Sequence, residues 1–104
     1  MPKVFILNNT SYDFSPAEEF GELKINSTES FPIFNTGLTL SMVKSFLEDY
    51  TEEDFIVMSG SPVVSALAFC TIFSKFDKIH ILLFDAKGRK YVPRTFSKLQ
   101  VGLV

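Results

Sequence analysis

The chain has 104 residues, 46% of them hydrophobic, and a formal net charge of −2. This length predicts a single domain, residues 1–104, with one modest core. No apolar run approaches the roughly 20 residues that a membrane span needs, and the start lacks the features of a signal peptide. Cys70 is the single cysteine, which excludes an intramolecular disulfide. We therefore expect a cytoplasmic protein in which Cys70 is a buried, inert thiol.

Charge is distributed unevenly along the chain. From Asp13 to Asp54 there are ten acidic residues and two lysines, whereas from Phe55 to Val104 there are seven basic residues and two acids. Such asymmetry favours a charged partner or head-to-tail self-association. Two separate solvated faces would give the same pattern, so both interpretations stay open.

Short apolar runs predict the first elements. Residues 3–7 are apolar and partly β-branched, as in a central strand. Ser15, followed by proline and then by Glu18, predicts a short helix with Ser15 as its N-cap. Residues 22–26 predict a strand, and residues 31–35 predict another that its proline would confine to an edge.

The middle of the chain predicts two helices that flank a strand. Residues 38–50 place apolar side chains at helical spacing on one face, after a turn or cap at Asn35. Residues 55–58 predict a buried strand. Ser61 and the proline after it are a good helix start. The helix over residues 63–73 is apolar nearly all round, so we expect it to be covered on more than one side.

The C-terminal third predicts a strand over residues 79–84 and a hairpin turn at residues 86–88 that leads into residues 89–93. Residues 95–104 form either a last edge strand or a frayed tail. Continuous apolar strands that alternate with helices indicate a parallel sheet. The predicted fold is therefore α/β: a small three-layer, Rossmann-like domain whose mostly parallel sheet ends in an antiparallel C-terminal hairpin edge.

Candidate ligand-binding residues lie where the predicted strands end, because open α/β sheets bind ligands outside the carboxyl ends of their strands. The free N–H groups of the helix that begins near Ser61 favour an anion such as phosphate or carboxylate. Ordinary turn and cap chemistry explains the same residues without a ligand. The glycine-rich dinucleotide fingerprint and the Walker lysine pattern are both missing from the sequence. The candidates are Asn8, Asn9, Thr10, Ser11, Asp13, Ser59, Gly60, Ser61 and Asp85.

Two of these candidates, Asp13 and Asp85, have side chains that suit Mg²⁺ binding or acid–base chemistry. Solvated loop carboxylates are the competing interpretation. His80 lies within a predicted strand and is expected to be partly buried and hydrogen-bonded. One cysteine and one histidine cannot build a usual zinc site, so neither a metal site nor a cofactor is predicted.

Basic and aromatic residues alternate around the predicted hairpin, where Arg89 and Tyr91 would share one face. Such a ribbon can bind nucleic-acid phosphates or an acidic partner. Cationic protection of an exposed sheet edge is the alternative. The residues concerned are Lys87, Arg89, Lys90, Tyr91 and Arg94.

The sequence resembles small, uncharacterised α/β proteins of bacteriophages and other mobile elements in three stretches: residues 7–16, residues 56–60, and residues 82–85 leading into Tyr91. The resemblance implies an accessory role rather than a defined catalytic residue. Three hypotheses follow. The favoured one is a non-catalytic module that binds a host protein or a second copy of itself, without membrane contact. The others are a nucleotide or phosphate binder, with weak Mg²⁺-dependent nuclease or phosphatase activity as an option, and a nucleic-acid binder.

Overall fold

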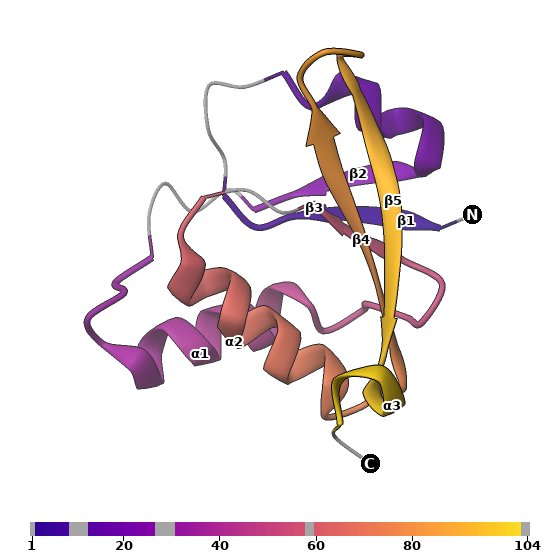
Figure 1. Cartoon of the computed structure of the whole chain (residues 1–104). Coiled ribbons are helices and arrows are strands. Elements are labelled where there is room, and N and C mark those ends of the chain that lie inside the picture. The colour runs from indigo at the N-terminus through magenta and orange to yellow at the C-terminus, as the bar shows by residue number, and fades with distance from the viewer. Residues whose placement is uncertain (1, 9–12, 27–30, 58–59, 103–104) are drawn as a thin grey trace.

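A computed structural model describes residues 2–8, 13–26, 31–57 and 60–102 of the chain (Figure 1). Within these residues one sheet has the strand order β2-β1-β3-β4-β5. All neighbouring strands run parallel except β4 and β5, which are antiparallel. The predicted class, a mostly parallel α/β sheet with an antiparallel hairpin at one edge, is therefore confirmed. The strands are β1 (Lys3–Ile6), β2 (Glu22–Ile25), β3 (Phe55–Val57), β4 (Lys78–Asp85) and β5 (Lys90–Ser97).

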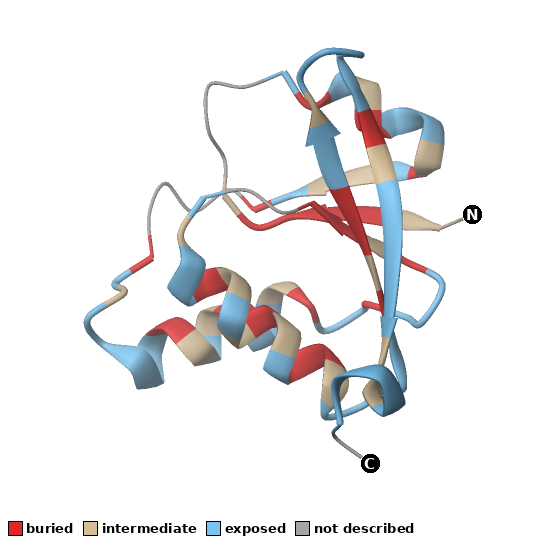
Figure 2. Ribbon diagram, in the orientation of Figure 1, coloured by how far each residue is buried: buried red, intermediate tan, exposed pale blue. Residues whose placement is uncertain are grey.

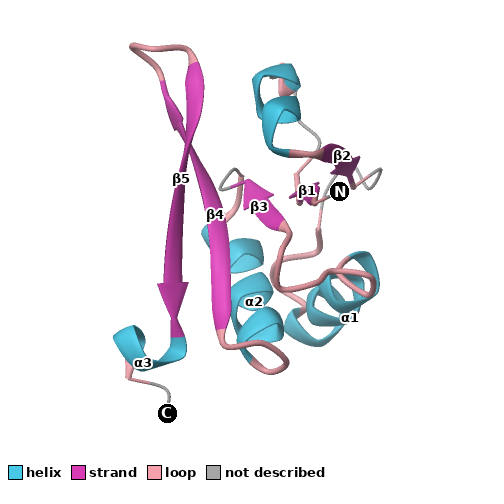
Figure 3. Ribbon diagram, turned by 90° about the vertical axis from the view of Figure 1, so that its right-hand side faces the viewer, coloured by secondary structure: helices cyan, strands magenta, loops and turns pink. Residues whose placement is uncertain are grey.

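The helices lie on both faces of the sheet, and Figure 3 shows α1 and α2 together on the side opposite η1. The strand order explains this arrangement. The chain leaves β1 toward β2, then returns past β1 to β3 and β4. Because parallel crossovers are right-handed, reversing direction moves the connecting helices to the other face. The elements are η1, a 3-10 helix (Ser15–Phe20), α1 (Thr36–Phe46), α2 (Pro62–Phe73) and α3 (Lys98–Val101).

The core is divided by the sheet into two parts, because successive side chains of a strand point to opposite faces. Phe5 of β1 and Ile56 of β3 pack with residues of α1 and α2. Val4 and Val57 pack on the other face with residues of η1. Buried residues accordingly follow the central strands and the inner sides of the helices (Figure 2). Most of the phenylalanines belong to these clusters, whereas Phe34, Phe84 and Phe96 are exposed.

Two predicted helix starts have the expected caps, and one does not. The Asn35 side chain accepts a hydrogen bond from the Leu38 amide at 3.1 Å, and Ser61 Oγ accepts one from the Val63 amide at 3.2 Å. Ser15, in contrast, is already inside η1, and the prediction that it is the N-cap was wrong. Its amide instead donates to the carboxylate of Asp13, two residues earlier.

The strand predicted over residues 31–35 is also wrong. This segment is a turn, in which the Asn35 amide donates to the Pro32 carbonyl at 2.8 Å. The same carbonyl accepts the Thr39 hydroxyl of α1 at 2.7 Å. Proline cannot donate to a strand ladder, and its carbonyl is engaged by the helix that follows. At the other end of the chain, β5 continues through Ser97 and is followed by α3 rather than by a frayed tail.

Asp54 joins the start of the sheet to the connector before β3. It is 1% exposed, and its two carboxylate oxygens accept the amides of Lys3 and Thr51, both at 2.8 Å. The Lys3 ammonium lies 3.2 Å from Oδ2, and the Tyr50 hydroxyl donates to the Asp54 carbonyl. Burial alone would raise the pKa of Asp54, but these hydrogen bonds and the Lys3 charge hold it below its ordinary value.

Candidate functional site

Three of the predicted ligand-binding residues come together where β1 and β3 end. Gly60 has φ +78, and a Cβ built on it would overlap the side chain of Asn8. Ser61, the next residue, begins α2 as its N-cap. Asn8 after β1 and Gly60 before α2 therefore approach each other closely, which agrees with the expectation for two of the three strand ends. Asn9, Thr10, Ser11 and Ser59 lie outside the described residues, and their predicted roles stay predictions.

Asp13 directly precedes Phe14, which packs in the same buried cluster as Tyr91 of the β4–β5 hairpin. Its carboxylate is exposed and accepts the Ser15 amide at 2.9 Å, and this hydrogen bond lowers the pKa of Asp13. Burial raises the pKa of Tyr91 on β5, and the charge of Asp13 raises it further. The hydrogen bond of Asp13 thus goes to the first residue of η1.

Asp85 is the last residue of β4, three residues beyond Leu82, which pairs with the end of β3. Its Oδ1 accepts the Lys87 amide at 3.1 Å, so it shapes the hairpin turn. Among the described residues, no group of three or more acidic, histidine or cysteine side chains is placed to hold a metal ion. Roles for Asp13 and Asp85 in Mg²⁺ binding or acid–base chemistry stay predictions.

The basic hairpin is exposed at Lys87, Arg89, Lys90 and Arg94, but its aromatic member is not. Tyr91 is only 7% exposed and packs its ring against Phe84, with centroids 5.2 Å apart. Arg89 lies in the turn with φ 51 rather than in the strand. The expectation that Arg89 and Tyr91 share one face was therefore wrong, because Tyr91 is needed in the core beneath η1. Nucleic-acid contact through the exposed cations stays a prediction.

His80 lies on β4 as expected, partly buried and hydrogen-bonded. Its Nδ1 is 2.7 Å from the Thr95 hydroxyl on β5, and its ring contacts that of Phe55. These contacts give His80 a structural role in joining three strands.

Helix α2 carries a feature that the sequence analysis did not identify as a site. Its inner side, which includes Val64 and Ala68, is buried, whereas Val63, Ala66 and Cys70 are exposed. These last three residues are spaced by three and four positions, so they form one stripe along the outer face of the helix. We call them the α2 stripe. The prediction that Cys70 is buried was wrong, because neither α1 nor the sheet reaches this face of α2.

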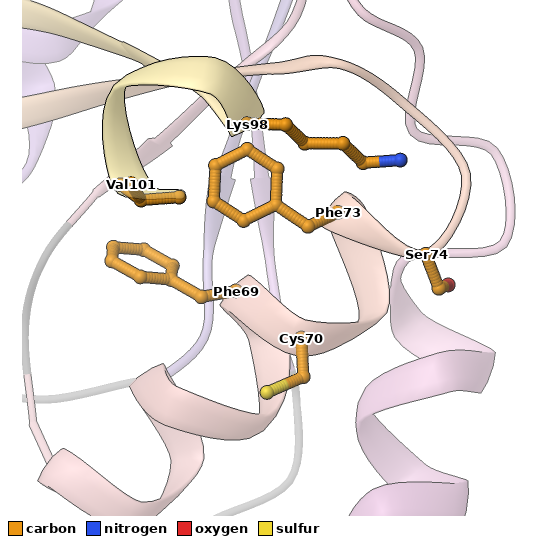
Figure 4. Close-up of a pocket in the computed structure, with 6 residues that line it drawn as sticks. All are labelled: Phe69, Cys70, Phe73, Ser74, Lys98 and Val101. Atoms are coloured by element: carbon orange, nitrogen blue, oxygen red, sulfur yellow. The ribbon is translucent and has the colours of Figure 1, made fainter. Parts of the chain in front are cut away.

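Beside the C-terminal half of the α2 stripe lies a groove between α2 and α3, with a volume of about 510 Å³. The Phe69 and Phe73 side chains extend from α2 toward Val101 on α3, and Lys98 lies along the rim (Figure 4). We call this feature the α2–α3 groove. Its lining is Phe69, Cys70, Phe73, Ser74, Lys98 and Val101.

The short helix α3 is held in place by contacts at its start. Ser97 and Gln100 form a capping box, in which each side chain accepts the other residue's amide. The Lys98 amide donates to the Asp77 carbonyl at 2.8 Å, and the Lys98 ammonium lies 3.8 Å from the Asp77 carboxylate. These contacts attach α3 to the turn between α2 and β4, so the groove has a defined far wall.

The same face of the sheet continues the apolar surface along the hairpin. Phe96 of β5 pairs with Ile79, and Arg94 pairs with Ile81, so both lie on the face that α2 covers. Phe96 is 40% exposed and Leu83 is 42% exposed. The face of the hairpin that α2 partly covers thus exposes two apolar side chains, Phe96 and Leu83, and the cation Arg94.

A family comparison gives the relationship of this chain to known proteins. The model of a family described as Phage Pam3 gp32-like protein matches residues 2–98. The chain belongs to this family. The match confirms the resemblance to phage proteins, and it includes the whole sheet and α2 and ends at the first residue of α3. Neither the curated proteins nor the solved structures gave a match. No described helix is long and apolar enough to cross a membrane.

Proposed function

We propose that this phage-family chain is a small, non-catalytic protein-binding module that acts through the outer face of α2. One observation carries the proposal: α2 contains no charged side chain, yet it exposes the α2 stripe of Val63, Ala66 and Cys70. Surface helices ordinarily present polar residues on their outer face. A contiguous apolar patch on a small domain is typical of a protein–protein contact.

The surroundings of α2 support this proposal. Helix α1 and strand β4 cover its inner side, and α3 reaches only its C-terminal end, at the α2–α3 groove. A partner seated on α2 would remove the stripe and the groove from water together, which is favourable in proportion to the apolar area. The partner is a host protein or a second copy of this chain. A free, exposed Cys70 also suits a reducing cytoplasm.

Site-specific photo-crosslinking tests the proposal. A photoreactive amino acid replaces Ala66 in the α2 stripe, and a control replaces Glu19, which is exposed on η1 on the opposite face of the sheet. We expect discrete adducts from position 66 and none of the same adducts from position 19. Adducts that are identical from both positions, or missing from position 66, would contradict the proposal.

A second candidate function, binding of a nucleotide or phosphate, is favoured by the strand order. Order 2-1-3-4-5 is also that of flavodoxin-like domains, which bind their ligand between β1 and β3. Asn8, Gly60 and Ser61 lie at that point, which supports a Rossmann-like site. A thermal-shift series with nucleotides, phosphate and Mg²⁺ tests it. We expect one nucleotide class to raise the midpoint of thermal unfolding, and we expect Ser61→Ala to abolish this increase. If no compound in the series shifts the midpoint, this candidate function is removed.

A further inference from the structure

We infer that the α2–α3 groove binds an acidic, amphipathic helical segment of the partner protein. This inference rests on the proposed function and identifies the chemistry of what the surface recognises. Three properties of the described residues carry it: an apolar floor, a basic rim and a fixed far wall.

The floor of the groove suits side chains from a helix. Phe69 and Phe73 are four residues apart on α2, so they are neighbours about 6 Å apart along the helix axis. Val101 faces them from α3 (Figure 4). A volume of about 510 Å³ lies in the range of pockets that hold bulky apolar groups. Apolar residues at positions i and i+4 of a partner helix would match this spacing.

Basic side chains lie on the rim of the groove and beside it. After Phe73 the chain carries seven basic residues and two acids. Near the groove, Asp77 lies 3.8 Å from the Lys98 ammonium and offsets part of its charge, and the Glu52 carboxylate accepts the Asp77 amide at 3.3 Å. Asp85 is at the far end of β4. Lys98 lines the groove, Lys75 follows α2, and Arg94 lies on the same face of the sheet. Acidic residues that flank an apolar stripe would therefore be attracted to this rim.

The same charges argue against a second copy seated symmetrically on the groove. A two-fold contact uses the same patch on both copies, so such an interface would collect the rim cations of both copies without adding a patch of opposite charge. A separate acidic segment supplies that opposite charge.

The far wall of the groove forms without a partner. The capping box of Ser97 and Gln100 orders α3, and the Lys98 amide bonds to the Asp77 carbonyl. Because the groove is already formed, less of the binding free energy is needed to order it.

Two matched synthetic peptides test the inference with the purified full chain. Each is a fluorescent helix of about four turns with leucines along one face. One carries glutamates beside that face, and the other carries lysines at the same positions. We expect fluorescence anisotropy to detect binding of the glutamate peptide only. Its Kd should rise steeply between about 0.05 M and about 0.5 M NaCl, because salt screens the exposed rim charges.

A pair of variants on α3 locates the binding site. Val101→Glu places a carboxylate in the groove, whereas Leu99→Glu adds the same charge at a residue that is 76% exposed and does not line the groove. We expect Val101→Glu to weaken binding of the glutamate peptide at least about tenfold, which is about 1.4 kcal/mol. Leu99→Glu should have a much smaller effect, and thermal unfolding of both variants verifies that they fold.

A measurement on the unmodified chain avoids any dependence on variant folding. Cys70 lines the groove, is exposed and is the chain's single cysteine. Saturating glutamate peptide should slow its reaction with a thiol reagent, and the lysine peptide should not.

The outcomes separate this inference from the proposed function. The inference is overturned when neither peptide binds, when the lysine peptide binds equally well, or when the two α3 variants bind equally. If crosslinks from position 66 are nevertheless found, the protein-binding function stands and only the acidic helical occupant is wrong. If the glutamate peptide binds but no crosslink forms, the groove chemistry stands and the proposed function fails.

Discussion

At the scale of single residues, Asp54 is a buried carboxylate held by several contacts. Its buried carboxylate bonds to two backbone amides and to the Lys3 ammonium, and so joins β1 to the connector that leads into β3. In the sequence Asp54 is one of ten acidic residues between positions 13 and 54, and nothing there assigned it a role. Its partners lie 51 and three residues away, and a single sequence does not reveal the first of these contacts.

Replacing Asp54 with Asn should lower the free energy of unfolding by about 2–4 kcal/mol at pH 7. One amide loses its acceptor, and the Lys3 ammonium loses its counter-charge. Urea denaturation measures the difference from the unmodified chain. Glu53→Gln, at the exposed neighbouring residue, is the matched control and should change stability little.

The same residue predicts an acid dependence of stability. The pKa of Asp54 is lowered in the folded state, so its contribution is fully present above the unfolded pKa of 3.8. That contribution is lost as pH falls through the folded pKa. The stability difference between the unmodified chain and Asp54→Asn should therefore shrink when denaturation is repeated below about pH 3. A difference that stays constant with pH would show that the carboxylate charge is not what stabilises this contact.

Gly60 makes a second prediction at this scale. Gly60→Ala should destabilise the fold by about 1–3 kcal/mol, because φ is +78 and the added methyl group would meet the Asn8 side chain. Thermal unfolding of Gly60→Ala, Asn8→Ala and the double variant separates these causes. Gly60→Ala should lower stability less in the Asn8→Ala variant than in the unmodified chain. Strict additivity would mean that the two loops do not touch.

At the scale of elements, continuous apolar runs made the sheet predictable. Residues 3–7, 55–58 and 79–84 each form a strand close to the expected bounds, because strands buried on both faces have little room for polar residues. The segment 31–35 failed because its apolar residues surround Pro32, whose carbonyl is taken by Thr39. Local composition alone did not distinguish an edge strand from a turn that packs against a helix.

Asn35 provides a prediction for helix α1. Asn35→Ala removes the acceptor of the Leu38 amide and should lower stability by about 1 kcal/mol. Asn35→Asp keeps an acceptor and should stay close to the unmodified chain in urea denaturation. Equal losses in both variants would mean that the side-chain cap contributes nothing.

Helix α2 shows where sequence patterning stops being informative. Its apolar residues predicted cover on more than one side, and the structure leaves Val63, Ala66 and Cys70 exposed. The pattern indicates that a helix avoids water. It does not indicate whether the cover comes from the same chain or from another molecule.

At the scale of the whole molecule, the structure shows where the basic residues of the C-terminal third lie. The basic C-terminal third forms the hairpin and the surroundings of the α2–α3 groove. The approach of Asn8 to Gly60 and Ser61 was predictable, since parallel strands bring their ends together. The groove was not, because Phe69 and Val101 are far apart in sequence and the Lys98–Asp77 contacts that help to hold α3 beside α2 follow no sequence pattern.

Labelling of Cys70 tests the central claim, that a protein covers the outer face of α2, most directly. The rate of reaction with a fluorescent maleimide is compared between buffer and a desalted extract of host cells. We predict that the extract slows labelling about tenfold or more, and that Ala66→Glu restores the rate. A control chain with Cys70→Ser and Glu19→Cys should label equally in both. Equal rates for Cys70 in buffer and extract would contradict the account.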